Sequence, residues 1–259
     1  MSAKTCSWRA LLGLLSMACL QGAEANDSPF PIVGISAGVN VSTGRYGGET
    51  EIEDTEIPVA LSVDFERVAF TVKVPYLSVS TTGPSQATTE SGLGDVSAGL
   101  TIFDVASNRD LGLALDVTAA VKLGTADADK GLGTGENDVS VYLDGYKFFD
   151  SVTLLGSIGH RWRGSSVSAP LNDVLLATIG ASVWASDDTL LGITFDYRQS
   201  AIPDTDDIRE LRGFASFPIS ENWLIEFHAF TGFTDSSPDW GGGIAIATQL
   251  RRFGFRTVD

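Results

Sequence analysis

The feature that most constrains this chain is an alternation of apolar and small or polar residues, repeated along most of its length. Its clearest instance runs from Leu111 to Leu123, where every second residue is apolar and the residues between include Asp116 and Lys122. A strand places successive side chains on opposite faces, so this segment has one apolar and one polar face. Read as a helix, it would scatter both charges among apolar neighbours. We therefore interpret it as a strand.

Segments of this kind recur along the chain and predict an all-β fold. Most of them have 11 to 14 residues, whereas an ordinary strand has about 5 to 6. A tilted strand of about 9 to 11 residues spans a bilayer, so length favours a membrane barrel over a secreted β-sandwich. The twelve predicted strands cover residues 30–42, 56–66, 68–80, 92–104, 111–124, 138–149, 151–163, 174–185, 189–199, 207–217, 221–233 and 241–253.

The connections between these strands support the same fold. Odd-numbered strands are followed by long polar segments and most even-numbered strands by tight turns, as in outer-membrane barrels with extracellular loops and periplasmic turns. The sequence predicts a transmembrane antiparallel up-and-down β-barrel of about twelve strands, with ten or fourteen as alternatives. The long segments are residues 43–55, 81–91, 125–137, 164–173 and 200–206.

The first residues predict export. Residues 1–25 combine a basic start, an apolar stretch over 10–20 and an Ala-x-Ala cleavage motif, which is typical of a signal peptide. An anchor helix and a lipoprotein signal at Cys19 are the alternatives. Both cysteines, Cys6 and Cys19, lie in this segment, so we expect no disulfide or thiolate site in the mature chain. Residues 26–259 then form one barrel domain in the bacterial outer membrane.

Alternation also predicts which charges point inward. A Lys or Arg that faces lipid at mid-bilayer costs roughly 2–4 kcal/mol, so the charged positions must line the lumen. For Asp95 and Lys122 two interpretations stay open: a charged constriction that contacts solute, or ion pairs that only stabilise the wall. The lumen-facing candidates are Asp64, Lys73, Asp95, Asp116, Lys122, Asp144, Arg161, Asp196, Glu210, Arg212 and Glu226.

Two stretches within residues 91–143 resemble a known family. Ser91-Gly92-Leu93-Gly94-Asp95-Val96 opens one strand, and Val121-Lys122-Leu123-Gly124-Thr125 leads into a loop that closes on Gly131-Leu132-Gly133-Thr134-Gly135. Both are similar to the outer-membrane transporters of the meta-pathway phenol-degradation family. The resemblance implies a barrel that passes small solutes, often aromatic or hydrophobic, and it implies no catalytic residues.

Charge and loop composition narrow the partners. A formal net charge of −16 argues against nucleic acid, so we expect outer-membrane lipid, lipopolysaccharide and a small-molecule solute, with no cofactor. Oligomeric state is left open. Asp127, Asp129 and Glu136 offer oxygen ligands for Ca²⁺ on one Gly-rich loop, but their spacing departs from the EF-hand pattern. A solvated acidic loop is the favoured interpretation, and we expect no metal site.

Two other functions compete with a channel. A lipid-modifying enzyme would need a serine activated by histidine near the outer rim, and His160 with Ser165 or Ser166 is the candidate set. The other histidine, His228, alternates with Glu226 and reads as a hydrogen-bond partner in the lumen. The second alternative is a structural or adhesive barrel with a plugged lumen. We favour a channel or transporter over an enzyme.

Overall fold

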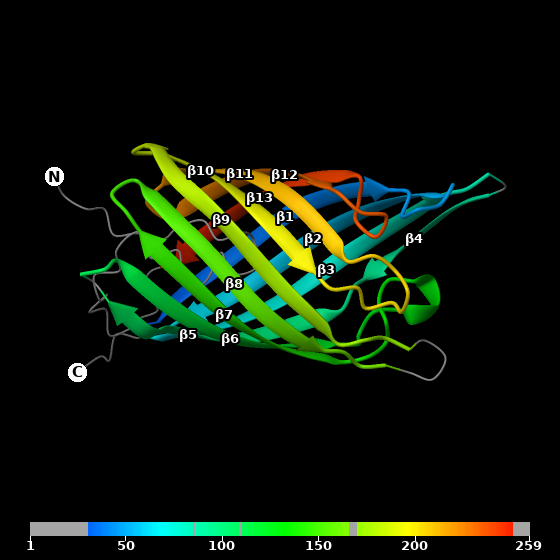
Figure 1. Ribbon diagram of the computed structural model, residues 1–259, viewed down its shortest axis with the longest axis horizontal. Helices are drawn as coiled ribbons and strands as arrows, with labels where there is room; N and C mark the ends of the chain where they lie inside the picture. The colour runs from blue at the N-terminus through cyan, green and yellow to red at the C-terminus, as the bar shows by residue number, and fades with distance from the viewer. Residues whose placement is uncertain (1–30, 85, 109, 166–169, 251–259) are drawn as a thin grey trace, which may run out of the picture.

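A computed structural model describes residues 31–250 except 85, 109 and 166–169. Within these residues, one antiparallel sheet closes into a barrel (Figure 1). The ring closes because β1 pairs with both β2 and β13, while β2 also pairs with β3. The strands are β1 (Ile32–Gly44), β2 (Glu51–Asp64), β3 (Val68–Thr82), β4 (Ala87–Leu93), β5 (Val96–Asn108), β6 (Leu113–Leu123), β7 (Asp138–Phe148), β8 (Val152–Trp162), β9 (Val174–Ser186), β10 (Thr189–Arg198), β11 (Ile208–Ser220), β12 (Trp223–Gly232) and β13 (Trp240–Leu250).

The described wall has twelve strand positions because β4 and β5 share one. The first part of β3, Val68–Lys73, pairs with β5, and its last part, Tyr76–Thr82, pairs with β4. The predicted strand 92–104 is thus interrupted at Gly94 and Asp95, where the backbone N–H of Gly94 donates to the carbonyl of Pro75 at 2.8 Å. The prediction of a twelve-stranded antiparallel barrel is confirmed.

The predicted loop 81–91 is wrong, because most of it forms a hairpin of β3 and β4. Polar composition pointed to a loop, yet Ser and Thr alternate here and pair across the strands. The hydroxyls of Ser80 and Thr89 lie 3.0 Å apart, and Tyr76 donates to Ser91 at 3.3 Å. Cross-strand hydroxyl pairs of this kind stabilise a sheet. The hairpin projects past the barrel rim (Figure 1).

Long and short connections lie at opposite ends of the barrel, which we name the loop end and the turn end. Because Val33 pairs with Leu250, β1 begins and β13 finishes at the turn end. The predicted signal peptide 1–25 and the last residues of the predicted strand 241–253 lie outside the described residues. Loops 45–50, 124–137, 163–173, 199–207 and 233–239 mark the loop end, and turns 65–67, 149–151, 187–188 and 221–222 mark the turn end.

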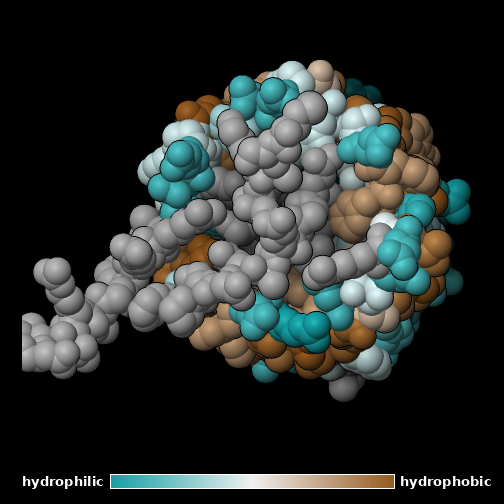
Figure 2. Space-filling model, turned by 90° about the vertical axis from the view of Figure 1, so that its left-hand side faces the viewer, coloured by the Kyte–Doolittle hydropathy of each residue, from teal (hydrophilic) through white to brown (hydrophobic). Residues whose placement is uncertain are grey.

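The outer wall is apolar and the inner wall is polar. Val59, Leu61 and Ile193 point outward with about half of their surface exposed, at 48%, 48% and 51%. Inward positions of the same two strands carry buried Ser62 and Thr194. Seen from one end, hydrophobic residues lie along much of the rim, with hydrophilic residues between them (Figure 2). This distribution is what contact with lipid requires.

Within the described residues, no helix is long and apolar enough to cross a membrane. The short 3-10 helix Ala128–Lys130 lies in the loop between β6 and β7.

Candidate functional site in the lumen

A cavity of about 1030 Å³ runs along the inside of the barrel. Its lining extends from Val79, near the loop end of β3, to Phe103 and Tyr146, near the turn end of β5 and β7. A space of this size matches the upper range of small-molecule sites. It is therefore large enough for a small solute.

Most of the predicted lumen residues line this cavity. Alternation places seven of them there, since each shares its parity with buried inward residues of the same strand, while Asp95 lies in the break between β4 and β5. Three candidates lie on inward positions outside the cavity lining: Asp64 at the turn end of β2, Glu210 on β11, and Glu226, which accepts a hydrogen bond from Ser216 at 2.9 Å. Their roles in transport stay predictions. The eight that line the cavity are Lys73, Asp95, Asp116, Lys122, Asp144, Arg161, Asp196 and Arg212.

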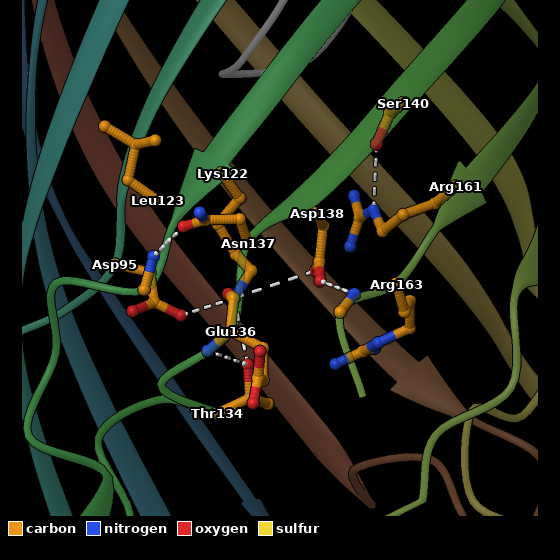
Figure 3. Close-up of polar contacts among 12 residues, drawn as sticks. Asp95, Lys122, Leu123, Thr134, Glu136, Asn137, Asp138, Ser140, Arg161 and Arg163 are labelled. Carbon is orange, nitrogen blue, oxygen red and sulfur yellow. Dashed lines mark hydrogen bonds and ion pairs between the residues drawn. The ribbon is translucent and has the colours of Figure 1, made fainter. Parts of the chain in front are cut away.

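Lys122 joins two strands and a loop in one cluster (Figure 3). Its ammonium Nζ lies 2.6 Å from Oδ2 of Asp95 and 3.7 Å from Oδ2 of Asp138. It also donates to Oγ1 of Thr134 at 3.1 Å and to the backbone carbonyl of Glu136 at 2.9 Å. Asp138 is buried, with 1% of its side chain exposed. We call these five residues the Lys122 cluster.

The cluster holds loop 124–137 against the lumen. Asp95 accepts a second hydrogen bond, from the backbone N–H of Ala126 at 3.0 Å. Gly131 and Leu132 line the cavity, and Leu132 is only 4% exposed. A Cβ on Gly133 would lie 2.8 Å from Oδ1 of Asp95, so only glycine fits this approach. The loop therefore narrows the lumen, an outcome that the sequence had left open.

The other cations of the wall also bind neighbouring groups. Lys73 pairs with Glu56 at 3.0 Å, and Arg212 Nε lies 3.8 Å from Oδ2 of Asp196. Arg161 donates to Oγ of Ser140 at 3.1 Å and to the hydroxyl of Tyr142 at 3.0 Å. Glu56, Ser140 and Tyr142 are residues that sequence reasoning did not select. The signal that could have found them is the alternation along β2 and β7, which places all three on the inward face of their strands.

Aromatic rings on the inner wall cover glycines of the next strand. Tyr142 pairs with Gly159, and Phe230 pairs with Gly241. A Cβ on Gly159 would lie 2.4 Å from Cδ1 of Tyr142, and one on Gly241 would lie 2.3 Å from Cζ of Phe230. Each ring thus lies close against the wall, in an arrangement known to support glycines in sheets. Both rings line the cavity.

The loop between β1 and β2 places a phenol near the mouth. Partial burial, together with the nearby carboxylates of Asp54 and Glu210, raises the pKa of Tyr46 to about 12. The guanidinium of Arg198 acts in the opposite direction. Tyr46 therefore stays protonated at neutral pH. The charged groups that act on it come from three strands: Asp54 from β2, Arg198 from β10 and Glu210 from β11.

The remaining candidates do not form a site within the described residues. Asp127 caps the 3-10 helix by accepting from the N–H of Asp129, and residues 31–250, apart from their gaps, contain no group of three metal-ligating side chains. His160 packs edge-on against Trp162 with ring centroids 4.6 Å apart, and its Nε2 lies 4.0 Å from Asp173. Ser165 accepts a hydrogen bond from Leu171, and Ser166 lies outside the described residues.

Comparisons with known proteins identify the fold. No family model matches the sequence, and no curated protein matches it. Among solved structures, the chain is similar to the COG4313 outer membrane channel from Pseudomonas putida F1, with a TM-score of 0.70, 12% identity, and coverage of 90% of this chain and 100% of that one. It is also similar to the KdgM porin, with a TM-score of 0.59, 10% identity, and coverage of 84% and 99%.

A third similar structure is the translocator domain of autotransporter NalP from Neisseria meningitidis. Its TM-score is 0.56 at 12% identity, with coverage of 86% of this chain and 89% of that one. A shared fold does not fix a shared function. The likeness therefore establishes one thing: this chain has the fold of the β-barrels that span outer membranes.

Proposed function

We propose that this chain forms a channel for small solutes in the bacterial outer membrane. The observation that carries the proposal is the cavity of about 1030 Å³, walled by charged and polar side chains inside an apolar outer surface. Burying a charged side chain costs free energy unless the charge is paired or hydrated. A water-filled interior that solutes can enter therefore explains why so many charged side chains line this cavity. The similar COG4313 channel and KdgM porin support the same function.

Solutes with an aromatic or apolar part fit this proposal best. Phe103, Tyr142, Tyr146 and Phe230 line the cavity beside its charges. Rings and apolar walls with a few polar groups are typical of small-molecule sites. The resemblance to the phenol-degradation transporters supports the same class of solute. The absence of a matching family model leaves that membership a prediction.

The test has two stages. The outer-membrane fraction is first run in cold and in boiled detergent, and a folded barrel shifts its gel mobility only on heating. The purified protein is then inserted into planar bilayers, where stepwise conductance is expected. A heat-shifted protein that inserts and never conducts would instead support the plugged barrel. A protein recovered in the periplasm without a shift would refute the membrane assignment.

A further inference from the structure

Carboxylates outnumber cationic side chains in the wall of the cavity. The part of the lining that the structure describes holds six carboxylates and four Lys or Arg side chains. A low-dielectric wall concentrates such an excess into a field along the lumen and raises the local concentration of counter-ions. The carboxylates are Asp54, Glu56, Asp95, Asp116, Asp144 and Asp196, and the cations are Lys73, Lys122, Arg161 and Arg212.

Two of these carboxylates face each other. Asp116 on β6 and Asp144 on β7 are register partners, and both line the cavity. Asp116 accepts a hydrogen bond from the backbone N–H of Asp104 at 2.8 Å. Like charges that lie directly opposite on neighbouring strands repel. A cation that passes this point of the wall lowers that repulsion, whereas an anion raises it.

One aromatic ring of the lumen contacts a guanidinium group of the protein. The guanidinium carbon of Arg212 lies 4.7 Å from the centroid of Phe230, within the range of a cation–π contact. Arg161 reaches the hydroxyl of Tyr142. Because Nε of Arg212 also lies 3.8 Å from Oδ2 of Asp196, this one site already holds a flat cation between a ring face and a carboxylate.

We propose that the lumen selects cations, and among organic solutes those that carry an ammonium or guanidinium group. The selectivity rests on the channel function proposed above and names the charge class of its solute. Carboxylates supply the field that draws the cation in, and the rings of Tyr142 and Phe230 bind its apolar part. An anionic aromatic solute would contact the same rings, but the field of the carboxylates repels it.

The test compares two aromatic probes of opposite, permanent charge: benzyltrimethylammonium and benzenesulfonate. Single channels are recorded in a KCl gradient, and each probe is then added to the loop side. The reversal potential should show a preference for K⁺ over Cl⁻ at about 0.1 M salt that weakens at about 1 M, where the Debye length falls to about 3 Å. Benzyltrimethylammonium should block the current at concentrations at least about tenfold lower than benzenesulfonate.

Three variants assign the effect. Asp144→Asn should move the reversal potential toward zero, and Phe230→Leu should weaken block by benzyltrimethylammonium while the reversal potential stays near that of the parent. Asp188→Asn, in the turn between β9 and β10, removes the same charge outside the cavity lining and should leave both readouts unchanged. Gel mobility checks that each variant is folded.

Each outcome separates this inference from the channel itself. Conductance without cation preference, or with stronger block by benzenesulfonate, overturns the selectivity and leaves the channel function standing. Complete absence of conductance in a folded, inserted protein overturns the channel function, and the selectivity with it. An unchanged reversal potential in Asp144→Asn would contradict the assigned source of the field.

Discussion

Removing the charge of Lys122 should release loop 124–137 from the lumen. The change is Lys122→Met, which keeps the side chain as far as the ε position and removes its ammonium. Two of the hydrogen bonds of this ammonium hold the loop directly, at Thr134 and at the carbonyl of Glu136. A third, to Asp95, orients the carboxylate that accepts from Ala126. The substitution therefore weakens all three of these contacts by which the cluster fixes the loop.

The size of the effect follows from these contacts. A hydrogen bond to a charged group contributes about 1.5–3 kcal/mol, and solvent screening lowers this for Lys122, whose side chain is 23% exposed. For the two direct loop contacts we expect a combined loss of about 3 kcal/mol. The ratio of closed to open loop should then fall about a hundredfold.

Cysteine labelling measures this directly. Leu132→Cys places a thiol on the loop at a position with 4% exposure, and the predicted mature chain contains no other cysteine. A maleimide should react slowly with this thiol in the parent and much faster after Lys122→Met. The control is Lys147→Met, an outward position on β7. Equal labelling rates with and without the Lys122 charge would refute the anchoring role of the cluster.

Three further predictions concern other parts of the barrel. Gly159→Ala should push the ring of Tyr142 into the lumen and lower single-channel conductance, because the added Cβ would lie 2.4 Å from the ring; unchanged conductance would contradict the ring position. The hydrogen bond from the N–H of Ser200 lowers the pKa of Asp207. The ionised Asp207 carboxylate therefore stabilises loop 199–207 fully above about pH 4, and this stabilisation is lost as pH falls through the lowered pKa. Pepsin cleavage of the loop should rise over that acid range, and Asp207→Asn should remove the pH dependence. His160→Ala should leave the lipid profile of the membrane unchanged, and an altered profile would revive the enzyme hypothesis.

Alternation predicted the wall well because its cause is local. The parity of one residue decides whether it meets lipid or lumen, and a charge such as Asp116 or Lys122 cannot face lipid cheaply. Such reasoning needs no knowledge of the partner strand. Eight of the charged candidates that it placed in the lumen accordingly line the cavity.

Pairing across strands could not be predicted in the same way. Tyr142 and Gly159 meet only because β7 and β8 pair in one register, and register depends on the turn between them and on the stagger of the whole barrel. The β3–β4 hairpin was missed because its many Ser and Thr residues are polar, and a polar segment is interpreted as a loop even though Thr also favours strands. Whether loop 124–137 folds inward stayed open at the level of sequence, because Thr134 and Glu136 become partners of Lys122 only after β6 and β7 have paired.

The anchor and the selectivity can be separated because they place opposite demands on charge. Lys122→Met removes a positive charge from the lining, so it should strengthen cation preference while it speeds labelling at position 132. Asp144→Asn removes a negative charge on β7 outside the Lys122 cluster, so it should weaken cation preference and leave labelling unchanged. Reversal potential reports the field, and the thiol reports the loop. If both variants moved both readouts together, one global change of the barrel would explain them, and the separate roles assigned to Lys122 and Asp144 would fall.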